Sequence, residues 1–350
     1  MSEALQIGYG LVGAGSIADF HARAIAMVPG AKLRAVSSRT VEGAARVATA
    51  HGAVAAAALD ELLARTDIDV VCVTAPSGVH GEIAIAALQA GKHVLCEKPL
   101  EITTARVDAI LAAAQAAHRH VGVVLPSRLG DGASAVVAAV RAGRLGRITL
   151  ASAYVKWWRT DAYYAANRWR GTWALDGGGA LMNQGIHGVD LLLWLAGLPE
   201  QVNAFAATLA HGAIEVEDTL VASLHFPGGA LGSIECATSC APGTSRRIEL
   251  CGSRGSITLV DDAIVRWDFD ESRPEDTDIK ARMGRGALGS GAADPRAIGV
   301  EGHRRVIADM TEAVRTGRPP IVPGTEGRKS VALIEAIYTA ARTGQSQRVR

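Results

Sequence analysis

The chain shows two successive patterns of apolar and polar residues. From residue 5 to about 125, short β-branched apolar runs alternate with Ala-rich stretches of helical length. This alternation is typical of stacked βαβ units with a parallel sheet. The expected strands are LQIGYGLVG, AKLRAVSS, DVVCVTAP, KHVLCEK and HVGVVLP, and the expected helices cover residues 16–28, 41–52, 77–91 and 103–118. The pattern therefore predicts an α/β Rossmann-type domain with a doubly wound parallel sheet.

After Pro126 the pattern changes. One helix is expected at 133–143, then an aromatic segment, then an apolar helix at 177–197. Alternating strands follow in close succession, at 203–210, 218–226, 230–238, 247–260 and 263–269. Consecutive strands joined by Gly or Asp turns favour an antiparallel sheet in an α+β domain. Residues 271–298 are polar and Gly-rich and are expected to form a mobile loop, and two amphipathic helices are expected near 300–317 and 326–343.

Length and composition agree with two domains, 1–125 and 126–350, and leave open that the closing helices pack back on the first. With 49% hydrophobic residues, 20% charged residues and a net charge of +1, the chain shows no sign of disorder or of a nucleic-acid or membrane surface. The N-terminal stretch has neither a basic segment nor a cleavage site, and no apolar run reaches membrane-spanning length. We expect a cytoplasmic protein with a small-molecule partner. The five cysteines lack the spacing of a zinc or redox motif and are expected to be reduced core thiols.

A glycine motif follows the first expected strand. VGAGSIA places Gly13, Gly15 and Ala18 as GxGxxA at the start of a helix, where a dinucleotide pyrophosphate can approach the helix N-terminus. The second strand ends in AVSSRT, so Ser38 stands where an acidic residue would bind the ribose hydroxyls of NAD, and Arg39 follows. An Arg beside an uncharged residue suits a 2′-phosphate. The sequence therefore predicts NADP or NAD as cofactor, with a slight preference for NADP, unless Arg39 only stacks on the adenine or faces solvent.

Lys98 follows the expected strand KHVLCEK, at the end where open α/β sheets bind ligands. The chain has few lysines among its 36 basic residues, and a lysine differs from an arginine in its compact ammonium group and its readily shifted pKa. Lys98 is therefore a candidate catalytic residue. The alternative is an ordinary surface lysine.

Polar residues interrupt the apolar stretch GGGALMNQGIHGVDLLLWLAG. At 100° per residue, Asn183, His187, Asp190 and Trp194 fall on one face of an α-helix. His187 has the chemistry of a general base, and Asp190 could orient it or could form an ordinary ion pair. A metal is not expected here, because the stripe lacks a third strong ligand.

The segment YVKWWRTDAYYAANRWRGTW gathers most of the Trp and Tyr residues of the chain among basic residues. Aromatic faces pack on sugar C–H surfaces, and Arg and Tyr bind hydroxyl, carboxylate or phosphate groups. We expect Tyr163, Tyr164 and Arg170 to contact a carbohydrate substrate, with Arg128 as a further candidate. The alternative is that the aromatic residues only seal the sheet.

Several of these motifs occur together in one family. VGAGSIA, TAPSGVH, AGKHVLCEKPL, the 177–197 helix, GRLGRI and the closing helices resemble the glucose-fructose oxidoreductase and inositol dehydrogenase (Gfo/Idh/MocA) family along essentially the whole chain. The resemblance implies a Rossmann domain, then a domain with a large, mainly antiparallel sheet whose open face serves oligomerisation, with the active site between them. It also implies that Lys98 and His187 are catalytic and that the Lys98–Pro99 peptide bond can be cis. Many members have Asp where this chain has Asn183, so a carboxylate role there is in doubt.

The candidate residues are as follows. The catalytic set is Lys98, His187, Asn183 and Asp190; the cofactor set is Gly13, Gly15, Ser16, Ile17, Ser38, Arg39, Pro76, Ser77, His80, Glu97 and Lys98; the substrate set is Arg128, Tyr163, Tyr164, Arg170, Asn183 and His187. His303 opens the penultimate helix, and a purely structural role is open for it.

The main hypothesis is an NAD(P)-dependent oxidoreductase that transfers a hydride between the nicotinamide and a ring hydroxyl or ketone of a sugar, cyclitol or sugar derivative. His187 would take the hydroxyl proton and Lys98 would stabilise the developing alkoxide. The resemblance is strongest to pyranoside dehydrogenases, and a free and a nucleotide-linked sugar both remain open. We expect a homo-oligomer. The alternatives are a non-catalytic regulatory protein that binds cofactor and sugar, and a reductase of a non-sugar unsaturated substrate.

Overall fold

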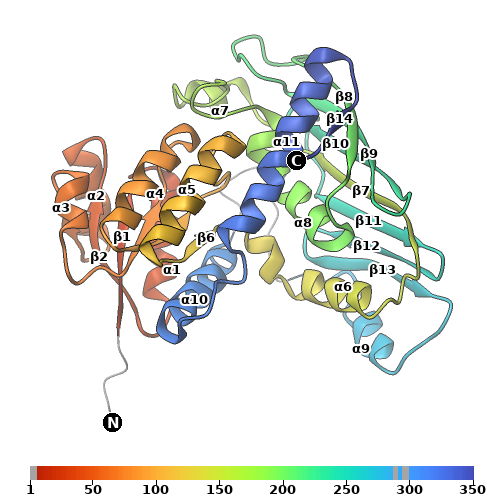
Figure 1. Ribbon diagram of the computed structural model, residues 1–350, viewed down its shortest axis with the longest axis horizontal. Helices are drawn as coiled ribbons and strands as arrows, with labels where there is room; N and C mark the ends of the chain where they lie inside the picture. Colours follow the sequence, from red (N-terminus) through yellow and green to blue (C-terminus); the bar gives the residue numbers. More distant parts are fainter. Residues whose placement is uncertain (1–5, 287–290, 294–298) are drawn as a thin grey trace. The chain divides into compact units, whose positions relative to one another are not determined.

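The computed structural model describes residues 6–286, 291–293 and 299–350 and divides into two units (Figure 1). The first unit comprises residues 1–126 and 300–328, and the second comprises 127–299 and 329–350. The boundary along the chain lies at residue 126, and the first closing helix belongs to the first unit.

The first unit is built on a six-stranded parallel sheet in the order β3-β2-β1-β4-β5-β6. The strands are β1 Ile7–Val12, β2 Ala31–Ser37, β3 Val54–Ala55, β4 Val70–Val73, β5 His93–Cys96 and β6 Val121–Val123. The helices are α1 Ser16–Ala26, α2 Val41–Ala50, α3 Leu59–Leu63, η1 Ser77–Val79, α4 His80–Gln89, α5 Thr104–Ala117 and α10 Glu301–Thr316. This is the expected Rossmann sheet, although the two-residue β3 and the short α3 were too brief for their patterns to show.

Hydrogen bonds attach α10 to this sheet. The Tyr9 hydroxyl of β1 lies 2.7 Å from the Thr311 hydroxyl and 3.3 Å from the Ile307 carbonyl oxygen. Tyr9 is fully buried, so these bonds satisfy a hydroxyl that would otherwise be left without a partner in the core.

The second unit is built on an eight-stranded mixed sheet in the order β13-β12-β11-β7-β10-β9-β8-β14. The strands are β7 Ile148–Lys156, β8 Gln201–Ala207, β9 Thr219–His225, β10 Leu231–Ala237, β11 Arg247–Gly252, β12 Gly255–Val260, β13 Ala263–Phe269 and β14 Gln347–Arg348. The pair β7–β10 is parallel and the other pairs are antiparallel. The sequence analysis predicted a mainly antiparallel sheet but did not identify β7, because its residues overlap the aromatic segment.

Helices cover one face of this sheet. The helical elements of this part of the chain are η2 Pro126–Leu129, α6 Asp131–Arg141, α7 Asp161–Ala165, the π-helical turn η3 Ala180–Gly185, α8 Ile186–Ala196, α9 Glu275–Ala281 and α11 Gly324–Thr343. α8 packs on β7 and β11, and α6 packs on β12 (Figure 1). The other face presents exposed apolar side chains, among them Phe205, whose exposed fraction is 82%, and Val221 directly opposite it.

Part of the expected mobile loop at 271–298 is ordered. Residues 275–281 form α9, and the buried Asp276 carboxylate accepts hydrogen bonds from the Trp267 indole at 2.7 Å and from the Arg144 guanidinium. These bonds hold the pKa of Asp276 below its usual range, chiefly through Arg144. The polar composition of the segment gave no sign of these buried bonds of Asp276. Residues 287–290 and 294–298 of the predicted loop lie outside the described residues.

All five cysteines lie in the described part of the chain and are free thiols. Cys72, Cys96 and Cys236 are buried, and Cys240 and Cys251 are half-buried. In the described ranges, none of the helices is both long and apolar enough to cross a membrane.

Candidate active site

The glycine loop of the first unit joins β1 to α1. Gly13 has a φ of +119°, and a Cβ there would lie 2.6 Å from the Thr74 backbone, so only glycine fits. A Cβ on Gly15 would meet nothing within 4 Å. The first glycine therefore packs the loop against the end of β4, and the second leaves open space before the first N–H groups of α1, at Ser16 and Ile17. Such a helix start fits a pyrophosphate.

The residues after β2 form a polar turn. The Ser38 hydroxyl donates to the Thr40 carbonyl oxygen at 2.7 Å and accepts from the Thr40 N–H, and Arg39 is exposed. Arg46 of α2, which the sequence analysis missed, donates to the Ala14 carbonyl oxygen at 2.6 Å and pairs with Asp19. A cation therefore lies at the glycine loop. No motif marks Arg46, because it lies on a helix that only the fold brings to this loop.

His80 ties together the segments that follow β4 and β5. Its ring nitrogens lie 2.8 Å from the Ala75 and Pro99 carbonyl oxygens. Burial lowers the pKa of His80. His80 thus fixes the segment that carries Lys98, and Pro76 and Ser77 belong to the turn it spans. The Lys98–Pro99 peptide bond is cis, as the family resemblance implied.

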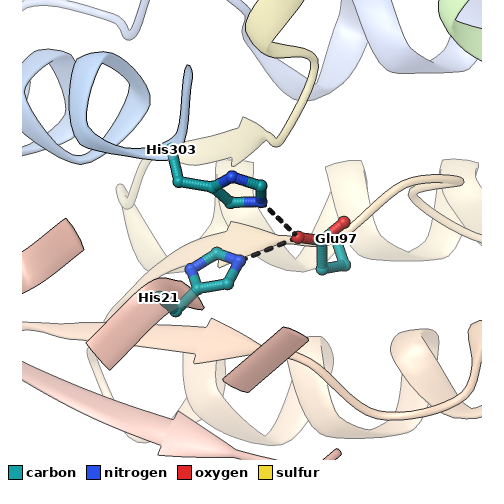
Figure 2. A group of neighbouring side chains, drawn as sticks. All are labelled: His21, Glu97 and His303. Atoms are coloured by element: carbon teal, nitrogen blue, oxygen red, sulfur yellow. Dashed lines mark hydrogen bonds and ion pairs between the residues drawn. The ribbon is translucent and has the colours of Figure 1, made fainter. Parts of the chain in front are cut away.

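Glu97 ends β5 beside two histidines of other elements (Figure 2). Its Oε1 lies 2.8 Å from His21 Nε2 of α1 and 3.5 Å from His303 Nε2 of α10. Burial would raise the pKa of Glu97, but the hydrogen bonds and charges of the two histidines outweigh burial and hold it well below its usual range. Burial lowers the pKa of His21. An ionised carboxylate between two histidine donors follows from these contacts.

The three side chains also have a metal-like spacing, since their ligand atoms lie within 4.8 Å of one another. A metal-bound histidine nearly always donates its second ring N–H to an acceptor. In the described structure, Nδ1 of both His21 and His303 is buried without a hydrogen-bond partner. If each neutral histidine carries its proton on Nε2, that N–H donates to Glu97 and the unpartnered Nδ1 bears no proton. No buried N–H is then left without an acceptor. We therefore interpret the trio as a hydrogen-bonded anchor, in which Glu97 Oε2 also accepts the Lys98 N–H at 3.2 Å.

In the second unit, Asn183 and His187 stand out by their exposure. Every residue from 176 to 193 is buried except these two, which are half-buried. The segment is not the single α-helix predicted from periodicity: residues 180–185 form the π-helical turn η3, and α8 begins at Ile186. The 100° spacing therefore does not extend back to Asn183. π-Helical turns are frequent at functional sites.

Asn183 is held by a buried carboxylate. Its side-chain amide donates to Asp176 Oδ1 at 2.5 Å, and Asp176 Oδ2 accepts the Gly171 N–H at 2.9 Å. This orients the Asn183 amide. The sequence analysis did not single out Asp176, because a lone Asp before a glycine run reads as a turn residue.

Asp190 and Arg128 form a buried ion pair. The Arg128 guanidinium donates two hydrogen bonds, at 2.9 and 2.7 Å, to the two carboxylate oxygens of Asp190, and both side chains are at most 2% exposed. Ser330 donates to the same carboxylate at 3.4 Å. The structure therefore shows the ion-pair alternative for Asp190, and it pairs Arg128 with this carboxylate where Arg128 was expected to contact substrate. The two parallel hydrogen bonds between these charged groups are strong, and each group compensates the buried charge of the other. The residues are far apart in the sequence, so the sequence did not show that they are in contact.

The aromatic segment contributes Tyr163 and Arg170 to one cluster. The Arg170 guanidinium lies 4.2 Å from the centre of the Tyr163 ring, and Gln184 donates to the Tyr163 hydroxyl at 3.0 Å. Tyr164 instead is buried, and its hydroxyl lies 2.8 Å from the Thr238 hydroxyl. Tyr163 and Arg170 are therefore placed next to the π-helical turn, while Tyr164 packs inside the unit.

Comparison with known proteins adds the family. Residues 7–125 match the model of the oxidoreductase family with the NAD-binding Rossmann fold, and residues 134–258 match the GFO/IDH/MocA C-terminal domain. The WlbA dehydrogenase of Bordetella pertussis, solved with NADH and UDP-GlcNAcA, is 34% identical, with 99% of each chain covered and a TM-score of 0.88. The chain belongs to the Gfo/Idh/MocA oxidoreductase family.

Curated relatives of full length agree. The 1,5-anhydro-D-fructose reductase of Ensifer adhaerens is 27% identical over 351 residues, covering 97% of this chain and 98% of the relative. The inositol 2-dehydrogenase of Rhizobium meliloti is 25% identical over 342 residues, covering 95% and 96%. The chain is an NAD(P)-dependent oxidoreductase of a family whose members act on sugars or sugar nucleotides, which confirms the predicted enzyme class and sets aside the non-catalytic alternative.

The buried ion pair leads to a stability prediction. Asp190→Ala should lower the free energy of unfolding by about 3–5 kcal/mol, because it leaves the Arg128 charge buried without its carboxylate. Chemical denaturation measures this loss. The double variant Arg128→Met, Asp190→Leu should recover much of it, because no buried charge remains. Equal destabilisation in the single and double variants would contradict a role in charge compensation.

Proposed function

We propose that this enzyme transfers a hydride between the nicotinamide and a ring hydroxyl or ketone of a pyranose-type sugar, with His187 and Lys98 handling the hydroxyl proton. The observation that carries the proposal is the exposure of Asn183 and His187 alone within a buried stretch. A side chain that the fold leaves accessible on such a segment is available to a ligand.

His187 serves as the general base that takes the hydroxyl proton as the hydride leaves. The Lys98 ammonium stabilises the negative charge that develops on the hydroxyl oxygen and shares in handling its proton. Asn183, oriented by Asp176, binds a neighbouring sugar hydroxyl with its amide. In this role a neutral Asn replaces the aspartate of many relatives without needing to carry charge.

The cofactor supplies the hydride acceptor when bound, and the described residues fit a dinucleotide. Gly15 leaves open space before α1, Arg46 places a cation at the loop, and His80 and Glu97 fix the Lys98 segment. We further propose a preference for NADP, because Ser38 offers no carboxylate to the ribose and Arg39 is exposed beside it. The relative solved with NADH makes this preference a point to test.

The favoured substrate class is a nucleotide-linked sugar. The relative that is 34% identical over nearly the whole chain was solved with UDP-GlcNAcA, whereas the full-length curated relatives named for free sugars or cyclitols are 25–27% identical. Tyr163 and Arg170 supply an aromatic face and a cation suited to a sugar that bears an anionic group.

The deciding experiment follows nicotinamide absorbance with UDP-linked hexoses, UDP-linked uronic acids, free pyranoses and inositols, each with NAD and NADP. Lys98→Ala and His187→Ala should each lower kcat by on the order of a hundredfold or more while leaving the cofactor Kd nearly unchanged, because each removes a group that acts on the hydroxyl. Equal turnover by wild type and His187→Ala would contradict the role of His187. Turnover of free pyranoses or inositols without turnover of any UDP-linked sugar would contradict the favoured substrate class.

The cofactor preference has its own prediction. Arg39→Ala should lower the ratio of kcat/KM for NADP to that for NAD by about tenfold to a hundredfold, the value of one hydrogen bond to a charged group. Ser38→Asp should shift the ratio further towards NAD, because a carboxylate repels the 2′-phosphate and accepts ribose hydroxyls. A ratio that Arg39→Ala leaves unchanged would show that Arg39 does not read the phosphate.

We also propose that the open face of the eight-stranded sheet associates with a second copy of the chain. Phe205 and Val221 lie directly opposite each other on that face, and Leu150 and Leu231 form a second exposed pair. Exposed apolar patches on a sheet face mark interaction surfaces.

The double variant Phe205→Asp, Val221→Asp should be monomeric in light scattering, because two carboxylates cannot be buried unpaired in an interface. Glu215→Gln, at an exposed carboxylate outside these strands, is the matched control and should keep the wild-type mass. A monomeric wild type, or an unchanged mass in the double variant, would contradict association through this face.

A further inference from the structure

The π-helical turn that carries Asn183 begins inside the second unit, where water cannot reach its first N–H groups. The N–H groups of Gly179 and Leu181 donate to the Glu217 carboxylate at 2.9 and 2.8 Å. The Ala180 N–H donates to the Glu217 carbonyl oxygen at 2.9 Å. One residue from a different part of the chain therefore satisfies three consecutive backbone donors.

Tyr338 of α11 completes this set. Its hydroxyl accepts the Met182 N–H at 3.2 Å and donates to Glu217 Oε1 at 2.9 Å. Residues 179–182 thus have every N–H occupied by Glu217 or Tyr338. A helix start normally leaves such donors to water or to a local cap, and leaving them unpaired in the core is costly.

The glycines before the turn are required by this contact. A Cβ on Gly179 would lie 1.7 Å from the Glu217 carbonyl oxygen, and one on Gly178 would lie 2.2 Å from the Tyr338 hydroxyl oxygen. The close approach of this backbone to the Glu217 carbonyl and to the Tyr338 side chain therefore depends on the absence of side chains at 178 and 179.

We propose that Glu217 and Tyr338 are positioning residues, which set the place of Asn183 and of the start of α8 by holding the N–H groups of residues 179–182. This inference rests on the proposed function, in which Asn183 and His187 act on the substrate. Neither Glu217 nor Tyr338 needs to touch the substrate. Displacing catalytic groups by about 1 Å can cost on the order of a hundredfold in rate.

Ionisation of Glu217 provides a second readout. Burial raises its pKa to about 7, although hydrogen bonds from Leu181, Tyr338 and Gly179 lower it. The titratable groups facing it are Tyr338, Cys236 and Tyr164, and burial raises the pKa of all three, so they stay neutral. Because this pKa is raised in the folded protein, the protonated carboxyl of Glu217 stabilises the arrangement in which it binds residues 179–182. This stabilisation is present at low pH and is lost as the pH rises through about 7.

The test uses Glu217→Gln and Tyr338→Phe, with Glu215→Gln as the matched control. Glu215 lies two residues from Glu217, but its carboxylate is exposed and accepts the Trp173 N–H at 3.1 Å. Each test variant should lower kcat by about tenfold to a hundredfold and leave the cofactor Kd within twofold, while Glu215→Gln should resemble wild type. Hydrogen exchange of the amides of residues 179–182 should become faster in both variants.

The pH dependence separates positioning from general loss of structure. In wild type, exchange at residues 179–182, corrected for its intrinsic rate, should become easier as the pH rises from about 5 to 8, because the buried carboxyl loses its proton. Glu217→Gln cannot ionise and should abolish this dependence, whereas Tyr338→Phe should keep it.

Two results would overturn the proposal: unchanged exchange at residues 179–182 in both variants, or faster exchange there without any fall in kcat. If wild type turns over none of the sugars tested, the proposed function fails instead. The exchange data then still decide whether Glu217 and Tyr338 hold the segment, because exchange needs no substrate.

Discussion

A buried backbone donor must find an acceptor, and the second unit is organised around one place where several such donors occur together. The start of the π-helical turn is buried and has no side-chain cap at Gly179, so Glu217 and Tyr338 supply its acceptors from distant parts of the chain. The glycine run, the position of Asn183 and the burial of a carboxyl group all follow from that requirement. Burying the Glu217 carboxyl is unfavourable, but its hydrogen bonds fix residues 179–182 in place.

The first unit meets a similar requirement differently. Glu97 is also a buried carboxyl, but two histidines surround it and keep it ionised, and one of its oxygens holds the backbone of Lys98. Burial raises the pKa of Glu217 to about 7, whereas the two histidines beside Glu97 outweigh burial and hold the pKa of Glu97 low. In the first unit the buried carboxyl of Glu97 holds the backbone of Lys98, and in the second the buried carboxyl of Glu217 holds the turn that carries Asn183. Lys98 is expected to act on the hydroxyl proton, and Asn183 on a neighbouring hydroxyl of the substrate.

The sequence was sufficient for the architecture. Alternation of β-branched and Ala-rich runs predicted the parallel sheet, whereas Lys98 and His187 were named as candidates from motif, residue type and family resemblance and stay predictions. It could not supply Glu217 or Arg46, because their contacts lie 36 and 32 residues away along the chain. It also missed Asp176, which is seven residues from Asn183, because the turn between them follows no helical spacing. Periodicity also failed at Asn183: a π-helical turn stabilised by tertiary bonds does not follow the 100° spacing of an α-helix. An ion pair was one of the two roles expected for Asp190, but its partner Arg128 lies 62 residues away and was expected at the substrate instead.

The parallel pairing of β7 with β10 has a consequence for how the chain folds. These neighbours at the middle of the sheet are separated by residues 157–230, so the strands can pair only after that long crossover has been drawn together. The crossover contains the aromatic segment, the glycine run, the π-helical turn and α8. Closing so long a loop costs conformational entropy before the contacts between β7 and β10 stabilise the pair. Topologies with many such long-range contacts fold slowly. A molecule in which β7 and β10 are paired therefore already has the segment with Asn183 and His187 looped between these two strands.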